Sequence, residues 1–97
     1  MSSLTQKVLR DALAQLGGWT GDAHQIHRTL ELDEAQHADL TERIKVFADA
    51  MHLRPLIRRY NGRTEIRLGG PEQVITATEV AFAARVEDAY RTVTQSS

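Results

Sequence analysis

The sequence predicts an α+β fold, a two-layer sandwich in which an antiparallel sheet of three or four strands carries three helices on one face. The first observation is Asn61-Gly62, which separates two β-rich runs. Both turn residues of a type I′ hairpin need positive φ, so this dipeptide is the strongest short hairpin signal. The second observation is three stretches with apolar residues at helical spacing, each introduced by a capping signature.

Length and composition limit the possible functions. The 97 residues form one domain, 1–97, with room for one modest core. The absence of cysteine excludes disulfides and the usual structural zinc sites, and we expect no metal centre and no cofactor. A net charge of -1 gives no overall attraction to nucleic acid or to an anionic membrane. Without a secretory signal or an apolar spanning run, a cytoplasmic location is expected.

The first predicted helix runs from about Leu4 to Leu16 and ends at Gly17-Gly18. Its signals are the capping-box pair Ser3 and Gln6 and the apolar positions Val8, Leu9, Ala12, Leu13 and Leu16. Trp19 follows directly, and we expect its indole to fill the junction between this helix and the sheet. The segment from Trp19 to Asp22 forms either a turn or a short fourth strand.

A strand is predicted from Gln25 to Leu32, because Ile26, Leu30 and Leu32 share one face. Arg28 interrupts that apolar face. We expect this strand to be the exposed edge of the sheet. His24 and His27 point to opposite faces of an extended chain, which argues against a metal site.

Two further helices follow from capping signatures and apolar seams. The pairs Asp33 with Gln36 and Thr76 with Glu79 mark their beginnings. Their seams, spaced i, i+4, i+7 and i+11, are Leu40, Ile44, Phe47 and Met51 in one, and Phe82, Val86, Ala89 and Val93 in the other. Gly69-Gly70-Pro71 ends the strand before the last helix.

The hairpin turn fixes the pairing of Leu56–Tyr60 with 63–68. Tyr60 lies opposite Arg63 and Arg58 opposite Glu65, with alternate pairs on opposite faces. One face carries Ile57, Ile66 and Leu68. The other carries Arg54, Leu56, Arg58, Tyr60, Arg63, Glu65 and Arg67. This second set is too charged to be buried against helices, so it indicates a face for solvent, a ligand or a partner.

The order of elements resembles the pterin-4a-carbinolamine dehydratases over nearly the full length. The shared features are Gly18-Trp19 after the first helix, a strand, a long helix, a hairpin introduced by Pro55, and a capped last helix. The resemblance implies a reaction that removes water from a 4a-hydroxytetrahydropterin, with histidines as general acids and bases. It implies dimers that extend the sheet, some of which form tetramers. Relatives without the histidine pair include assembly chaperones, and other members are dimerisation cofactors of transcription factors.

The resemblance also assigns positions in this sequence: the family's signature residues fall on Asp49, Leu53, Arg54, Pro55, Glu65 and Glu79. Three of these are histidines in the family, but here they are Leu53, Arg54 and Glu65. Leucine transfers no proton, and arginine stays protonated at useful pH. The catalytic candidates that remain are Glu65, His52 and Asp49. His52 is offset by one residue, which on a helix turns a side chain by about 100°, and an ion pair with Arg58 would lower the pKa of Glu65.

Two functions therefore stay open. The first is a homodimeric binding or assembly module whose Arg54, Arg58, Arg63, Arg67 and Tyr60 hold an acidic protein segment or an anionic ligand. The second is an active 4a-hydroxytetrahydropterin dehydratase, or an enzyme of altered pterin chemistry, with a rebuilt site. A pocket that binds a pterin-like ligand without turnover is intermediate between them. A membrane partner is not expected, and nucleic acid is disfavoured because the arginines are few.

Overall fold

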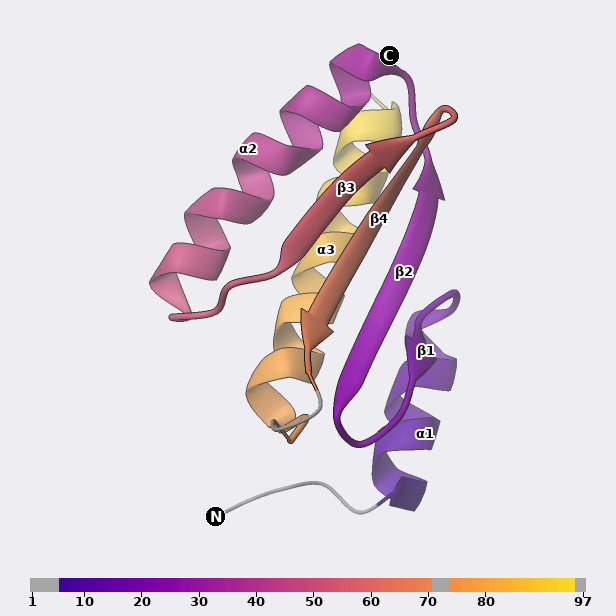
Figure 1. Cartoon of the computed structure of the whole chain (residues 1–97), viewed down its shortest axis with the longest axis vertical. Coiled ribbons are helices and arrows are strands. Elements are labelled where there is room, and N and C mark those ends of the chain that lie inside the picture. Colours follow the sequence, from indigo (N-terminus) through magenta and orange to yellow (C-terminus); the bar gives the residue numbers. More distant parts are fainter. Residues whose placement is uncertain (1–5, 71–73, 96–97) are drawn as a thin grey trace.

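In the part of the chain that the structure describes, a four-stranded antiparallel sheet carries three helices on one side (Figure 1). The computed structural model describes residues 6–70 and 74–95. Its elements are α1 (Gln6–Leu16), β1 (Thr20–Gly21), β2 (Gln25–Glu31), α2 (Glu34–Ala50), β3 (Leu56–Tyr60), β4 (Arg63–Gly69) and α3 (Ala77–Gln95). The predicted α+β fold is thus confirmed, and the short segment after Trp19 does supply a fourth strand. No helix in the described ranges has the length and apolar character needed to cross a membrane.

The β3–β4 hairpin forms with the predicted register. Asn61 and Gly62 have φ values of 50° and 75°, as a type I′ turn requires. Tyr60 lies opposite Arg63, and Arg58 lies opposite Glu65. The turn therefore decides which side chains of both strands face the helices and which face outward.

The edges of the sheet differ from the expectation. The strand order is β1-β2-β4-β3, so β3 forms one edge. The prediction that the strand from Gln25 to Leu32 is the exposed edge is wrong for its first half, because β1 pairs with it at Ile26 and His27. The rest of β2 has no β1 neighbour because β1 is only two residues long.

The core lies between the sheet and the helices. Ile66 and Leu68 are buried as predicted, and Ile57 packs against them half-buried. All the helices contribute to this core through Leu9, Leu13, Leu40, Ile44, Ala48, Phe82, Ala83, Val86 and Val93. The apolar pattern of the first helix is wrong at one position, because Val8 is half exposed. The seams otherwise lie where helical periodicity places them.

Helix capping follows the sequence signatures where the structure describes them. The Asp33 side chain accepts from the Gln36 backbone N–H at 2.7 Å, and the Gln36 side chain accepts from the Asp33 N–H at 3.0 Å. At the start of α3, the Glu79 carboxylate accepts from the Thr76 N–H at 2.7 Å. Ser3, expected to cap the first helix, lies outside the described residues.

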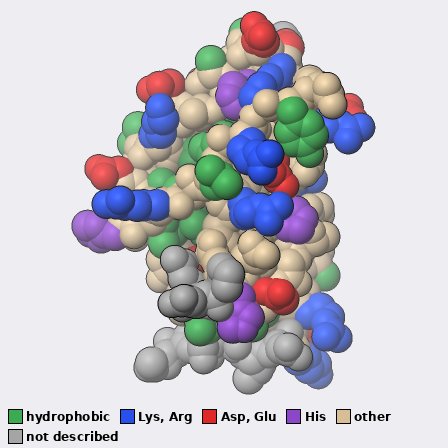
Figure 2. Space-filling view, in the orientation of Figure 1, with side chains coloured by type: hydrophobic (Ala, Val, Ile, Leu, Met, Phe, Trp, Pro, Cys, Tyr) green, Lys and Arg blue, Asp and Glu red, His purple; other side chains and the backbone are tan. Residues whose placement is uncertain are grey.

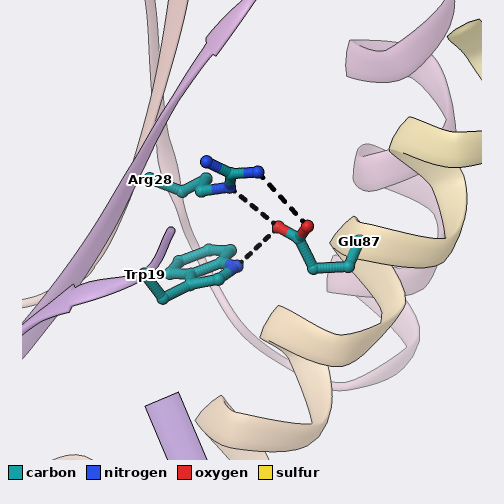
Figure 3. Close-up of polar contacts among 3 residues, drawn as sticks. All are labelled: Trp19, Arg28 and Glu87. Carbon is teal, nitrogen blue, oxygen red and sulfur yellow. Dashed lines mark hydrogen bonds and ion pairs between the residues drawn. The ribbon is translucent and has the colours of Figure 1, made fainter. Parts of the chain in front are cut away.

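A buried carboxylate on α3 contacts two side chains from a distant, earlier part of the chain (Figure 3). Glu87 on α3 accepts a hydrogen bond from Trp19 Nε1 at 2.7 Å and pairs with Arg28 Nε at 3.0 Å. Arg28 also lies over the Tyr90 ring. Trp19 is buried, as expected for a side chain that fills the junction of helix and sheet. Arg28, which interrupts the apolar pattern of β2, therefore points inward because an acid on α3 neutralises it.

Gly18 makes room for this cluster. A Cβ at this position would lie 2.1 Å from the Arg28 Nη1 atom, and the residue has a φ of 82°. Both the close approach and the left-handed backbone favour glycine over any other residue. The Gly18-Trp19 pair is thus explained by the packing of Arg28 against the chain that leads into β1.

Replacing Glu87 by alanine should destabilise the fold by about 3 kcal/mol, because it leaves a part-buried guanidinium and a buried indole N–H without their acceptor. Asp88→Ala is the matched control. Asp88 follows Glu87 on the same helix, but its side chain forms only an exposed ion pair with Arg91. Urea unfolding followed by Trp19 fluorescence measures both variants, because Trp19 is the sole tryptophan. Equal stability of the two variants would contradict a structural role for the cluster.

Candidate functional site

The outer face of the sheet is open, with basic side chains gathered around hydrophobic ones over β3 and β4 (Figure 2). Leu56, Arg58 and Tyr60 lie there beside Arg67, Glu65 and Arg63, in that order. Leu56 is 51% exposed and Tyr60 is 44% exposed. The register therefore brings together most of the side chains that the sequence assigned to a ligand or partner face.

Glu65 lies at the centre of this face but is only 9% exposed. Its carboxylate pairs with Arg67 Nη2 at 3.0 Å. Arg58 lies opposite Glu65 as predicted, but the predicted ion pair between them is wrong. Arg67 forms it instead, because it lies two residues along the same strand and so shares the face of Glu65. The hydrogen bond from Arg67 lowers the pKa of Glu65, and the nearby charges of Arg67, Arg58 and His27 act in the same direction. Glu65 is thus an ionised carboxylate at neutral pH.

The arginines of the open face differ in their freedom to bind a partner. Arg67 contacts both Glu65 and the Gln25 side chain, the latter at 3.4 Å. Arg58 and Arg63 are exposed, and neither forms an ion pair within the described part of the chain. Arg54 is also exposed but precedes β3, so the strand register does not place it. Arg58 and Arg63 are the cations of this face that remain available.

A groove of about 570 Å³ runs between α2 and the segment that leads into β3. Asp49, Leu53 and Pro55, three of the positions assigned by the resemblance, line it. Leu53 packs against the core. Four polar residues of α2 line the same groove: His37, Thr41, Lys45 and Asp49. Their i, i+4 spacing was readable in the sequence, but the sequence alone does not show that β3 lies opposite them.

His37 is a functional candidate that the sequence did not single out. Its Nδ1 lies 2.8 Å from the Thr64 hydroxyl, which accepts a hydrogen bond from Arg59 Nη1 at 3.4 Å. The Thr64 hydroxyl can therefore donate to Nδ1, which leaves the proton of a neutral imidazole on Nε2. Burial lowers the pKa of His37, and the Arg59 charge lowers it further. At neutral pH this side chain is an uncharged donor at the groove.

His52 lies at the C-terminal end of α2 with a φ of 59°. Its N–H bonds to the Asp49 carbonyl at 3.1 Å, and the Leu53 N–H bonds to the Ala48 carbonyl at 2.9 Å. These two bonds form a Schellman motif with His52 at the left-handed position, where glycine is usual. Its side chain is exposed and does not line the groove.

The three predicted catalytic residues thus lie in different settings. Glu65 is ion-paired on the open face, Asp49 lines the groove and His52 terminates a helix. Glu79, the remaining acid of the family pattern, bonds to Thr76 at the start of α3. Within residues 6–70 and 74–95, no group of three His, Asp or Glu side chains is arranged to hold a metal.

Comparison with known proteins agrees with this architecture. The family model described as pterin 4 alpha carbinolamine dehydratase matches residues 2–89. The crystal structure of a transcriptional coactivator/pterin dehydratase from Brucella melitensis superposes with a TM-score of 0.80 at 18% identity, covering 91% of this chain and 98% of that one. Comparison with curated protein sequences finds no match. The match to the family model covers most of the sequence, and the chain therefore belongs to the pterin 4 alpha carbinolamine dehydratase family.

Proposed function

We propose that this family member is a binding module for an acidic protein segment or an anionic ligand and does not dehydrate pterins. The observation that carries the proposal is the state of the three positions at which the resemblance assigns histidines. Leu53 packs against the core, Arg54 is a permanent cation, and Glu65 is ionised in its pair with Arg67. None of them can alternate between proton donor and acceptor near neutral pH.

The open face supports the binding role. Arg58 and Arg63 are exposed beside Tyr60, and guanidinium groups suit carboxylates and phosphates. The similar Brucella melitensis protein is described as a transcriptional coactivator as well as a pterin dehydratase. A role that depends on a protein partner is therefore consistent with the likeness. We further propose that the protein works in the cytoplasm, because its sequence has no cysteine to use in an oxidising compartment.

The alternative function is dehydration of a 4a-hydroxytetrahydropterin by a rebuilt site. One observation favours it: Asp49 lines a groove whose volume lies in the range of small-molecule pockets. A carboxylate there could accept hydrogen bonds from the amino and ring N–H groups of a pterin. A groove that binds such a ligand without turnover would keep the binding function.

The dehydratase assay separates these functions. On freshly generated 4a-hydroxytetrahydropterin, we expect micromolar protein to give the uncatalysed rate, because the residues at 53, 54 and 65 cannot shuttle a proton. His52→Ala and Glu65→Gln variants are measured in parallel. An acceleration that disappears in either variant would mean that the site has been rebuilt around that residue, and the proposal would be wrong.

Binding of an acidic probe tests the open face. A fluorescein-labelled hexaglutamate peptide should bind with an affinity that falls as salt rises, because exposed charges are screened. Arg58→Glu should weaken this binding about fivefold by reversing an exposed charge on that face. Lys7→Glu on α1 is the control with the same charge change away from the sheet. Fluorescence anisotropy measures all three proteins, and equal affinities would count against the open face.

We also propose a homodimer in which the part of β2 beyond Ile26 and His27 pairs with the same strand of a second copy. Support comes from the short length of β1: among the described residues, no strand pairs with that side of β2 beyond Ile26 and His27. Light scattering should give twice the chain mass at working concentration. A monomeric mass there would rule the dimer out.

A further inference from the structure

The outer edge of β3 offers backbone hydrogen-bonding groups. Residues that flank a two-residue turn form a hydrogen-bonded pair, and such pairs alternate along an antiparallel ladder. Tyr60, Arg58 and Leu56 therefore bond to β4. The N–H and C=O groups of Ile57 and Arg59 point away from β4, toward the edge. Since β3 is the last strand of the sheet, no strand of the described chain pairs with them.

The groove lies between α2 and the beginning of this edge, where Leu56 and Ile57 line it. In Figure 1, α2 lies beside β3 and runs in the opposite direction. The polar residues His37, Thr41, Lys45 and Asp49 span about 18 Å of helix. The five residues of β3 span about 17 Å. Leu53, Pro55, Leu56 and Ile57 form the apolar wall opposite the polar residues. The site therefore has the length of a short extended chain, longer than one small ring system needs.

The polar side of the groove contains groups that can hydrogen-bond to or pair with a bound ligand. The Thr41 hydroxyl is buried and has no hydrogen-bond partner among the described residues. His37 presents its remaining N–H donor when Thr64 donates to Nδ1. Lys45 forms no ion pair in the ranges that the structure describes. A buried hydroxyl without a partner costs free energy, which a bound carbonyl or hydroxyl group would recover.

The charge beside the edge indicates the kind of chain that fits. A strand added to β3 would place alternate residues beside Arg58 on the open face and the others over the groove. Carboxylates beside Arg58 form favourable cross-strand pairs. A second copy of β3 paired about its centre would instead set Arg58 opposite its own equivalent, and like charges at such positions are destabilising. An acidic chain is thus favoured over a second copy.

We propose that the β3 edge and the adjoining groove together bind an extended segment of a partner protein, about six residues long, in which acidic residues alternate with apolar ones. The segment adds a fifth strand to the sheet. Its acidic side chains contact Arg58, and its apolar side chains contact Leu53 and Ile57 in the groove. This inference rests on the proposed binding function and names the chemistry of the partner.

The test uses the full chain and three labelled hexapeptides: one alternating glutamate and valine, the same peptide N-methylated at alternate residues, and hexaglutamate. The alternating peptide should bind about tenfold more tightly than the other two, because only it supplies both strand pairing and apolar contacts. Hydrogen exchange should slow at the Ile57 and Arg59 amides when it binds, while the amides of Leu56 and Arg58 change little because they already bond to β4.

Protein variants separate the groove from the open face. Thr41→Phe fills the groove and should weaken the alternating peptide about tenfold. Val46→Phe is its control, because Val46 lies on α2, is 72% exposed and does not line the groove. Lys45→Glu places a negative charge at an exposed position of the groove, so it should also weaken binding of the acidic peptide. It tests the same surface if Thr41→Phe fails to fold.

The outcomes distinguish this inference from the proposed function. Equal binding of all three peptides, unchanged by Thr41→Phe or Lys45→Glu, would leave the open face as an acid-binding surface and overturn the strand addition. Absence of binding by every peptide would overturn both. Hydrogen exchange of the peptide-free protein tests a second copy on this edge. If the Ile57 and Arg59 amides are protected without peptide, and more so at higher protein concentration, a second copy occupies the edge and the peptide site is overturned.

Discussion

The rest of the structure depends on the contacts that the Glu87 carboxylate makes with Arg28 and Trp19. The carboxylate neutralises Arg28 on β2 and accepts the indole N–H of Trp19, so it fixes α3 against the sheet and against the chain that follows α1. An unpaired charge at this depth would be costly. The sheet therefore has one inner face, set by these contacts and the apolar core. The outer face of the sheet carries the exposed arginines, and the edge of β3 lies open beside α2.

Features encoded locally could be predicted from the sequence. Asn61-Gly62 determined the hairpin register, and the pairs at Asp33 and Thr76 marked helix starts, because each signal needs only a few neighbouring residues. Features that join distant residues were missed. Arg28 looked like an interruption because its partner is 59 residues away. β1 has only two residues, so the sequence leaves its segment open between a turn and a strand and predicts the exposed edge on β2.

The candidate site shows the same division. Alternation along β3 and β4 is enough to predict that Arg58, Tyr60 and Arg63 share one face, and the strand register confirms it. The sequence predicts an ion pair between Glu65 and Arg58 across the strands, whereas Arg67 forms it from two residues along the same strand. His37 and Thr41 line the groove, and the sequence alone does not show that this flank of α2 lies along β3. His52 serves as a helix terminus, a role normally signalled by glycine.

The position of Glu87 also has a consequence for synthesis of the chain. Trp19 and Arg28 are made early, but the carboxylate that they share comes 68 and 59 residues later. Contacts of such long sequence separation form slowly and only after loop closure. Until α3 is synthesised, the inner face of β2 carries an unneutralised guanidinium among apolar side chains. The nascent chain thus completes this domain only after α3 has been synthesised, and truncation before α3 would leave that face exposed to other chains.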